Sequence, residues 1–291
     1  MTDLEWLQAR RRGLGASDAS AVCGLSPWRT PLHVYLDKVG EWTEPDSAPK
    51  AWGRRLEEVV AQAYAEETGR PVRAPENRLE VHPNLPWLVA SLDRLTEVDG
   101  SVRVLECKTV RSDSGEWGVP GSDEVPPYYL VQCQHQLAVT GLEYCDLAAL
   151  FGGQELRVYT IERDEALASR LRLILSEFWA RVQERRPPLP TWTHPETPAL
   201  VASMMPADES VAIELGEEEA DWARRYRRLG EEVGRLQDER EVLKARLIHA
   251  MDGAARGILP GELSLRRHLV ERAGYVVAPT TYHAFFVRRH P

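Results

Sequence analysis

Residues 88–110 read LVASLDRLTEVDGSVRVLECKTV, and this stretch decides the fold class. Two runs within it, 88–92 and 102–107, are rich in Val and Leu and predict short strands. Asp99-Gly100 lies between the runs and is a strong signal for a hairpin turn. We therefore expect these two strands to be neighbours in a sheet.

Three polar side chains in this hairpin have the right types for chemistry. Asp93 closes the first strand, and Glu106 and Lys108 lie two residues apart on the second. Since side chains alternate along a strand, Glu106 and Lys108 share a face, and the hairpin brings Asp93 toward it. Two carboxylates suit a hard cation such as magnesium, which binds phosphate and activates water. Taken alone, these residues favour an ordinary solvent-facing role, because Glu-x-Lys is common in strands.

The flanking sequence predicts an α/β fold with a central mixed β-sheet between helices. Helical spacing is found at 52–68, 127–140 and 164–183, and further strand-like runs at 71–81, 146–151 and 157–161. Near the N-terminus, a helix and a glycine-bearing turn precede a second helix. Its expected N-cap is Ser17, at a helix end that also suits an anion. Pro31 is expected as the first residue of a third helix.

The composition is that of a folded chain without membrane spans. The 291 residues are 43% hydrophobic and carry a net charge of −9, and no stretch approaches the length of a membrane helix. The N-terminus lacks an apolar signal core, so we expect a cytoplasmic protein. The four cysteines are irregularly spaced and predict buried thiols rather than a zinc site or disulfides. The acidic total argues only weakly against DNA, because phosphate binding depends on local charge.

The C-terminal part differs in character from the rest. We expect one domain over residues 1–198 and a mainly helical appendage with a basic tail over 199–291. Residues 217–251 carry apolar side chains at alternating steps of four and three, interrupted by Arg240. This pattern is typical of an intramolecular helical hairpin, an oligomerisation element or a docking surface. We favour the hairpin, because an arginine is costly inside a continuous coiled coil.

Further motifs occur in a fixed order around the hairpin. They are Trp6, Arg10 and Ser17 in a W-x3-R-x6-S pattern, Glu57 in AWGRRLEEVVAQAYAEETG, Asp93 in VASLDRL, Glu106 and Lys108 in VLECKTV, and Gln132 in YYLVQCQHQLAVTG. This ordered set resembles the lambda-exonuclease or YqaJ-type viral recombinase nucleases, a branch of the PD-(D/E)xK superfamily, over roughly residues 4–180.

The resemblance implies a PD-(D/E)xK nuclease core and a role for each matched residue. Asp93 and Glu106 would bind metal together with the main-chain carbonyl of Cys107. Glu57 would position a second metal or its water, and Lys108 would be the catalytic lysine. The positions that match contacts to DNA phosphate, including the terminal 5′-phosphate, are Arg10, Ser17, Ser91 and Gln132.

The implied activity is a DNA exonuclease that uses two Mg²⁺ ions, with Mn²⁺ as a substitute. It would degrade the 5′-terminated strand of linear double-stranded DNA to 5′-mononucleotides and leave a 3′ single-stranded tail. By the same resemblance, the tail passes to a single-strand annealing protein in phage-type recombination within the bacterial cytoplasm, and the enzyme is a ring-shaped homotrimer. Two alternatives stay open: a structure- or site-specific endonuclease on the same core, and a non-catalytic DNA-binding module.

The chain departs from the family pattern at one place, and four further side chains are assigned roles outside the site. The family often reads Ser-Pro-Asp-Gly where this chain has SLDR at 91–94, so we expect an altered turn after the aspartate. Trp28 and Trp52 are interpreted as core residues rather than base-stacking ones. The lone histidines His82 and His135 are left out of the site.

Overall fold

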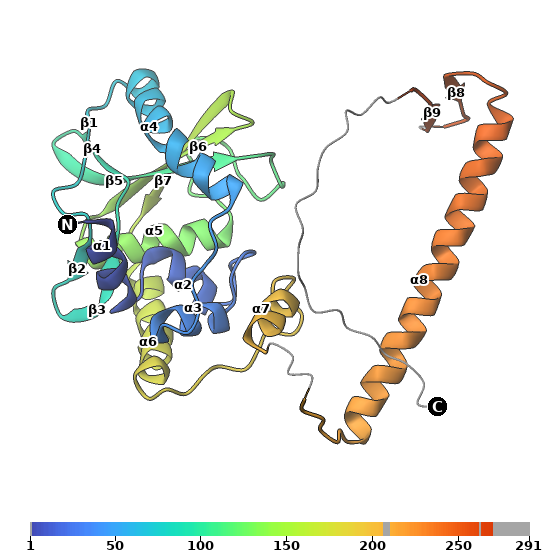
Figure 1. Ribbon diagram of the computed structural model, residues 1–291. Coiled ribbons are helices and arrows are strands. Elements are labelled where there is room, and N and C mark those ends of the chain that lie inside the picture. Colours follow the sequence, from blue (N-terminus) through green and yellow to red (C-terminus); the bar gives the residue numbers. More distant parts are fainter. Residues whose placement is uncertain (1, 206–209, 262, 270–291) are drawn as a thin grey trace. The chain divides into compact units, whose positions relative to one another are not determined.

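The computed structural model describes residues 2–205, 210–261 and 263–269 (Figure 1). The chain divides into two compact units, Met1–Met204 and Met205–Pro291. The predicted division between residues 198 and 199 falls inside helix α7 (Thr197–Met204), so the first unit extends to the end of that helix.

A five-stranded mixed sheet forms the centre of the first unit, with the order β1-β4-β5-β6-β7. Neighbouring strands are antiparallel except β5 and β6, which run parallel. This arrangement confirms the predicted α/β class and the mixed sheet. The strands are β1 (Val72–Arg73), β4 (Arg94–Val98), β5 (Ser101–Val110), β6 (Tyr144–Phe151) and β7 (Glu155–Glu162).

The two faces of this sheet are covered by different helices, α4 (Ala48–Thr68) and α5 (Pro127–Thr140) (Figure 1). Strand β5 alternates between them as its period of two requires. Leu105 and Cys107 pack in an apolar cluster with Tyr64 of α4. Glu106 faces α5 instead. The helix predicted at 127–140 is confirmed. It packs over β5 with polar side chains on the face that meets Glu106.

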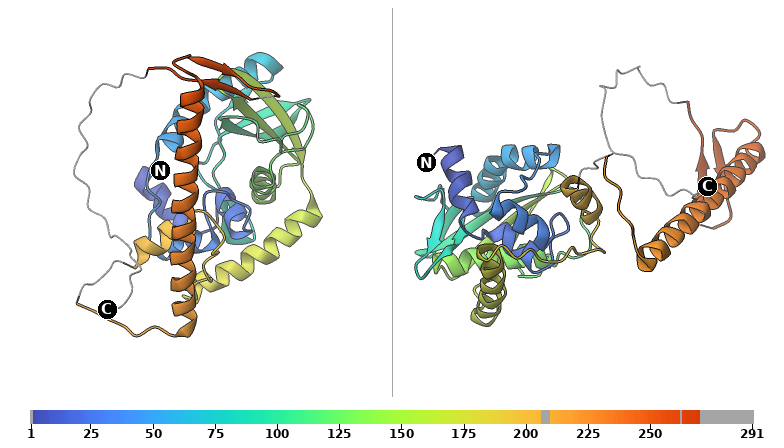
Figure 2. Two further views of the ribbon diagram at one scale, coloured as in Figure 1. Left: turned by 90° about the vertical axis from the view of Figure 1, so that its right-hand side faces the viewer. Right: turned by 60° about the horizontal axis from the view of Figure 1, so that its bottom comes forward.

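Helices α2 and α6 pack against α5, α3 packs against α2, and α1 packs against α3 (Figure 2). A two-stranded antiparallel sheet of β2 and β3 packs against α5 as well. The N-terminal segment joins this small sheet, because the N–H of Leu14 donates to Trp87 O at 2.7 Å. The elements are α1 (Asp3–Arg11), α2 (Ala16–Val22), α3 (Pro31–Val39), β2 (Glu80–His82), β3 (Leu85–Ala90) and α6 (Glu165–Gln183).

Two helix starts test the predicted caps. Helix α3 begins at Pro31 as expected. The prediction of Ser17 as the N-cap of α2 is wrong, because α2 begins two residues earlier than that cap implies and Gly15 occupies the N-cap position. The N–H of Gly15 donates to Asp18 Oδ2 at 3.0 Å, so the aspartate supplies the capping contact in place of the serine.

The strand predictions around the hairpin need two corrections. Residues 71–81 form no single strand, because β1 and β2 lie at the two ends of this segment in different sheets. Residues 88–92 are not the hairpin partner of β5, since β3 pairs with β2. The partner across Asp99-Gly100 is β4, which the sequence reading missed. Its residues, RLTEV, hold too few apolar side chains to stand out.

In the second unit, α8 (Glu217–Ala250) is one continuous helix, so the predicted helical hairpin is wrong. Gly230 and Gly234 lie inside this helix, so neither glycine interrupts it. A short antiparallel hairpin of β8 (Arg256–Ile258) and β9 (Ser264–Arg266) follows the helix. Most of the predicted basic tail lies outside the described residues.

Two predictions about side chains and spans can be compared with the structure. All four cysteines are free thiols, and Cys107, Cys133 and Cys145 are buried, as expected. Over the described ranges, every helix falls short of the length and apolar character that a membrane span requires.

Candidate active site

Asp93, Glu106 and Lys108 lie together, as the sequence predicts. Asp93 occupies the link between β3 and β4, and its Oδ2 accepts a 2.9 Å hydrogen bond from the Cys107 N–H of β5. On the α5 face of β5, the Nζ of Lys108 lies 2.5 Å from Glu106 Oε1. The alternation of β5 and the β4–β5 register therefore bring two carboxylates and an ammonium group to one point.

Glu106 is the most deeply buried of the three, with 2% of its surface exposed. Two glutamines of α5 donate to it, Gln136 Nε2 to Oε2 at 2.6 Å and Gln132 Nε2 to Oε1. A buried carboxylate without such donors would be costly, so these side chains make its burial possible. Gln132 thus contacts Glu106 here, while its predicted contact with phosphate stays a prediction. Gln136 lies one helical turn from Gln132, and this spacing places both amides on the same face of α5.

The electrostatics of this site are those of two acids and one base in a poorly hydrated place. Burial, followed by the charge of Glu106, raises the pKa of Asp93 well above its usual range. Burial alone would lower the pKa of Lys108, but the charges of Glu106 and Asp93 outweigh it and raise that pKa. Lys108 is therefore held protonated, and Asp93 resists ionisation while no further cation is present.

Glu57 is bound by an arginine. Its Oε1 lies 2.9 Å from Arg94 Nη1, which also donates to the main-chain oxygen of Asp93 at 2.5 Å. The other guanidinium nitrogen donates to Glu58 Oε2 at 2.5 Å. The sequence analysis did not assign Arg94 to the site. The replacement of the family's glycine by arginine at this position was the one signal that could have indicated it. Its guanidinium links α4 to the Asp93 segment.

The residues present fit a hard divalent cation at the Asp93–Glu106 pair. Two carboxylates meet there, and the raised pKa of Asp93 shows that their negative charge is incompletely offset. Across the described ranges, no three His, Cys, Asp or Glu side chains already stand in a metal-binding group. Glu57 pairs with Arg94 instead, so its predicted role toward a metal stays a prediction.

The N-terminal candidates form a chain of contacts that leads to Glu106. Arg10 Nη2 donates to Ser17 Oγ at 2.8 Å, and the Arg10 guanidinium lies 5.3 Å from the centre of the Trp6 ring. Trp6 Nε1 in turn donates to Ser91 Oγ at 3.1 Å. The main-chain oxygen of Ser91 accepts a long hydrogen bond from Gln136. The structure thus connects Arg10, Ser17 and Ser91, which the sequence separates widely.

A buried ion cluster fixes this N-terminal segment. Asp18 is fully buried, and its carboxylate lies 2.7 Å from Lys38 Nζ and 2.8 Å from Arg29 Nη1. Burial would raise the pKa of Asp18, but the charges of Lys38 and Arg29 outweigh it and lower that pKa. Lys38 also donates to the main-chain oxygen of Arg10 at 3.1 Å, so the cluster helps to position Arg10.

The prediction that Trp28 and Trp52 are core residues is wrong. Their exposed fractions are 55% and 57%. The Trp28 ring lies 5.2 Å from that of Tyr128, and the two tyrosine rings of Tyr128 and Tyr129 are 4.5 Å apart. The Tyr129 ring is 5.3 Å from Lys108 Nζ. Trp28, Tyr128 and Tyr129 therefore form an aromatic cluster that extends from solvent to Lys108.

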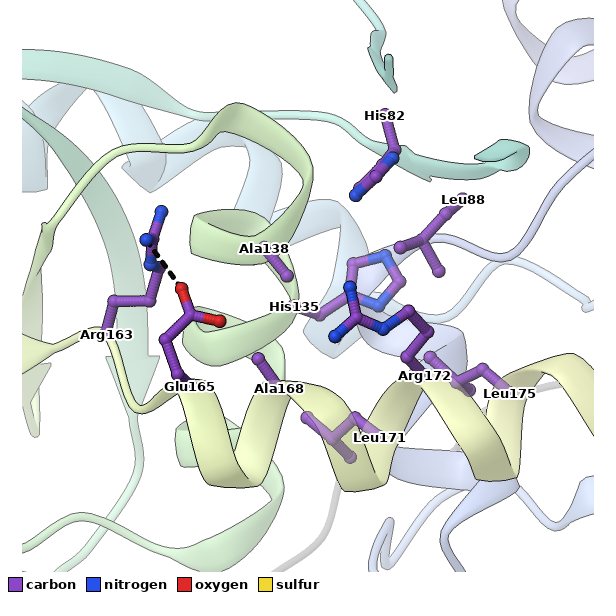
Figure 3. Close-up of a pocket in the computed structure, with 10 residues that line it drawn as sticks. All are labelled: His82, Leu88, His135, Ala138, Arg163, Glu165, Ala168, Leu171, Arg172 and Leu175. Atoms are coloured by element: carbon purple, nitrogen blue, oxygen red, sulfur yellow. Dashed lines mark ion pairs between the residues drawn. The ribbon is translucent and has the colours of Figure 1, made fainter. Parts of the chain in front are cut away.

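A separate cavity of about 180 Å³ lies between the small sheet, α5 and α6 (Figure 3). His82 and His135 both line it. The Nε2 of His135 lies 2.9 Å from Val89 O, and burial lowers its pKa, so it is a neutral core histidine. Arg163 and Glu165 form an ion pair of 2.5 Å at its edge, drawn as a dashed line in Figure 3. No candidate catalytic residue lines this cavity.

Comparison with known proteins identifies the family of this chain. Residues 5–143 match the YqaJ-like viral recombinase domain. The chain is 32% identical over 261 residues to the uncharacterized protein YqaJ of Bacillus subtilis (strain 168), covering 88% of this chain and 80% of that protein. The chain belongs to the YqaJ-like viral recombinase family. The uncharacterized protein R354 of Acanthamoeba polyphaga mimivirus is 28% identical over 152 residues, which are 49% of this chain and 27% of R354.

The fold of the YqaJ-like chain is also found in a solved nuclease structure. LHK-Exo, an alkaline exonuclease from Laribacter hongkongensis crystallised with dAMP, aligns with a TM-score of 0.50 at 23% identity. The alignment covers 63% of this chain and 94% of LHK-Exo. At this identity the likeness establishes the shared fold.

The raised pKa of Asp93 leads to a prediction about stability. The unfolded chain ionises this group at a lower pH than the folded chain does. The free energy of unfolding should therefore fall as pH rises from the ordinary carboxyl range through the raised pKa. Asp93→Asn removes this loss. Without divalent metal at alkaline pH, the free energy of unfolding of the variant should therefore exceed that of the wild type by about 1 kcal/mol. Denaturant titrations in EDTA across acid to alkaline pH measure the difference.

Asp46→Asn is the matched control, because the carboxylate of Asp46 is exposed and lies 2.7 Å from Arg54 Nη2 in an exposed ion pair. If Asp93→Asn destabilised the protein equally at every pH, the raised pKa assigned to Asp93 would be contradicted.

Proposed function

We propose that this YqaJ-family protein is a metal-dependent exonuclease that degrades the 5′-terminated strand of linear double-stranded DNA. The observation that carries the proposal is the convergence of buried Glu106, Asp93 and protonated Lys108 at one point of the central sheet. Family membership and the shared nuclease fold support hydrolysis of phosphodiester bonds.

Asp93, Glu106 and the main-chain carbonyl of Cys107 would hold Mg²⁺, and Glu57 would serve a second ion through water. Mn²⁺ would substitute, because both ions accept oxygen ligands. When bound, the ions supply Lewis acidity that polarises the scissile phosphate and lowers the pKa of water. For Glu57 to contribute, its carboxylate must leave the guanidinium of Arg94.

Besides the bound ions, the site contains the cationic side chain of Lys108. Its Nζ stays protonated beside Glu106, so it donates hydrogen bonds and does not act as the base. In this position it orients the attacking water and stabilises the negative charge that develops on the phosphate oxygens. Gln132 and Gln136 hold Glu106 in place while this happens.

The direction of digestion depends on the N-terminal candidates. Arg10 contacts Ser17 and Trp6, and Trp6 donates to Ser91. Gln136 then donates to both Ser91 and Glu106, so it connects the two residues. A terminal 5′-phosphate bound by these side chains would place the adjacent phosphodiester bond near Lys108. The products would be 5′-mononucleotides and a 3′ single-stranded tail, which we propose is handed to a single-strand annealing protein during phage-type recombination in the bacterial cytoplasm. A ring-shaped homotrimer around DNA remains part of this proposal.

Two competing functions make different predictions for the same assay. A structure- or site-specific endonuclease on this core would cut covalently closed circular DNA. A non-catalytic DNA-binding module would bind DNA without turnover, although retention of Asp93, Glu106 and Lys108 in contact argues against it.

The first prediction from this proposal concerns the catalytic group. Purified protein with Mg²⁺ should degrade linear DNA labelled at the 5′ end, prefer a 5′-phosphate over a 5′-hydroxyl, and spare closed circles. Glu106→Gln and Lys108→Ala should each lower the rate by about a thousandfold, because each removes charge at the reacting phosphate. Gel analysis of labelled products measures direction and rate together.

Glu162→Gln on β7 and Lys50→Ala on α4 are the controls, because they remove the same groups away from the site. Release of label from the 3′ end first, or cutting of circles at a comparable rate, would contradict the proposed exonuclease.

The second prediction concerns the aromatic cluster. We expect the exposed ring of Trp28 to stack on a base next to the phosphate at Lys108. Trp28→Ala should weaken binding of a labelled DNA end about tenfold, measured by fluorescence anisotropy in Ca²⁺. Trp52→Ala is the control, because Trp52 is equally exposed and pairs with Arg55 on α4. Equal effects of the two substitutions would contradict a specific role for Trp28.

A further inference from the structure

Arg94 contacts the site from two sides, through an acidic pair on α4 and through the main chain of the Asp93 segment. Its Nη1 lies 2.9 Å from Glu57 Oε1 and donates to the main-chain oxygen of Asp93 at 2.5 Å. Its Nη2 donates to Glu58 Oε2 at 2.5 Å. The side chain is 20% exposed, and it follows Asp93 directly at the start of β4. Because hydrogen bonds hold both edges of the planar guanidinium, its orientation is fixed.

The packing of α4 directs Glu57 toward the same end of β5. Val60 and Tyr64 lie three and seven positions further along α4, and both pack in one apolar cluster with Cys107 of β5. Residues at this spacing share one face of a helix, so Glu57 lies on the face that meets the sheet. Glu58 lies beside that face, with 76% of its side chain exposed. Glu57 is thus the member of the acidic pair that the fold turns toward the Asp93 segment.

The charge of Glu57 acts on the predicted cation site. Burial and the charge of Glu106 raise the pKa of Asp93, and the charge of Glu57 raises it further. At the neighbouring thiol of Cys107, burial and these three carboxylates raise the pKa, whereas Arg94 acts to lower it. Arg94 therefore already offsets part of the negative charge that a second ion would offset.

We propose that the guanidinium of Arg94 competes with a second divalent cation for the carboxylate of Glu57. The free protein would then bind one ion tightly, at Asp93 and Glu106, and a second ion only weakly. This inference rests on the proposed metal-dependent nuclease and gives an order to the binding of its two ions. At the position where the family pattern often has glycine, this chain carries a cation of its own.

The competition follows from the contacts that a second ion must break. An ion bound by Glu57 takes the place of a charge-assisted hydrogen bond, and it also repels the guanidinium beside it. Among the described residues, no three His, Cys, Asp or Glu side chains stand in a metal-binding group, which agrees with a Glu57 that Arg94 keeps apart. Arg94 is thereby a positioning residue, because it acts through the carboxylate of Glu57. Cleavage then depends on the concentration of free metal through the weaker ion.

Mn²⁺ titration of the full-length protein without DNA tests the competition, with free Mn²⁺ counted by electron paramagnetic resonance. The wild type should bind a second ion with a Kd at least about tenfold above that of the first. Arg94→Gln should lower the second Kd about tenfold, because the neutral amide no longer pairs with Glu57 as an ion. Arg94→Lys keeps a cation at this position and should leave the second ion weakly bound.

Two further variants separate this effect from a general change of charge. In the Arg94→Gln background, Glu57→Gln should abolish the gain, because the carboxylate for which the two cations compete is then gone. Arg55→Gln is the matched control, because Arg55 is two residues from Glu57 on α4 and its guanidinium lies 5.3 Å from the centre of the Trp52 ring. Its replacement removes the same charge and should leave both Kd values unchanged. Circular dichroism checks that each variant keeps its fold.

The tight ion distinguishes failure of this inference from failure of the proposed nuclease. Asp93→Asn should remove that ion in every background, and a wild type without it would contradict the proposed metal site itself. If the tight ion is present, two ions of equal affinity in the wild type would overturn the competition. So would a second Kd that Arg94→Gln leaves unchanged, or a gain that is as large in Arg94→Lys or that survives Glu57→Gln. A gain confined to Arg94→Gln and dependent on Glu57 supports the proposal.

Discussion

The approach of the half-buried carboxylate of Asp93 to the buried carboxylate of Glu106 is the constraint on which the site depends. Two carboxylates at one point of a protein interior repel each other and lose hydration. The Cys107 N–H and Lys108 Nζ offset part of this cost, and two glutamine amides of α5 offset more. The raised pKa of Asp93 shows that the compensation is incomplete without a further positive charge. A site of this kind is suited to bind a divalent cation and the phosphate that follows it.

The surrounding fold holds these groups in place from several directions. The parallel pairing of β5 and β6 requires a crossover, and α5 provides it while carrying Gln132 and Gln136 over Glu106. The Asp18 ion cluster joins α2 and α3 and holds the Arg10 carbonyl through Lys38. The N-terminal segment is thereby connected to the small sheet and to the centre of the site. Residues that are far apart in sequence meet because α5 contacts α2, the small sheet and β5.

Local sequence patterns predicted the features that depend on periodicity alone. The period of two placed Glu106 and Lys108 on one face, and the helical spacing at 127–140 gave α5. The predicted hairpin brought Asp93 toward the same face, and its carboxylate does accept a hydrogen bond from Cys107, although the strand that pairs with β5 is β4.

The rest depends on tertiary contacts that a periodic pattern does not contain. Strand β4 was missed because its few apolar residues are stabilised by pairing on both sides. Asp18 replaced Ser17 as the capping group because it is also the counterion of Lys38. Arg94 contacts Glu57 from another element, and no local signal announces a pair 37 residues apart. The continuity of α8 was missed because Arg240 was interpreted as a break in the apolar seam, whereas an exposed helix tolerates an arginine there.

The central claim is that Asp93 and Glu106 form one divalent-cation site, and anomalous X-ray scattering from crystals grown with Mn²⁺ tests it most directly. The account predicts an anomalous peak in contact with carboxylate oxygens of both residues. It also predicts loss of that peak in Asp93→Asn crystals. A protein that binds Mn²⁺ only at other side chains, with Asp93 and Glu106 left without an ion, would contradict the account.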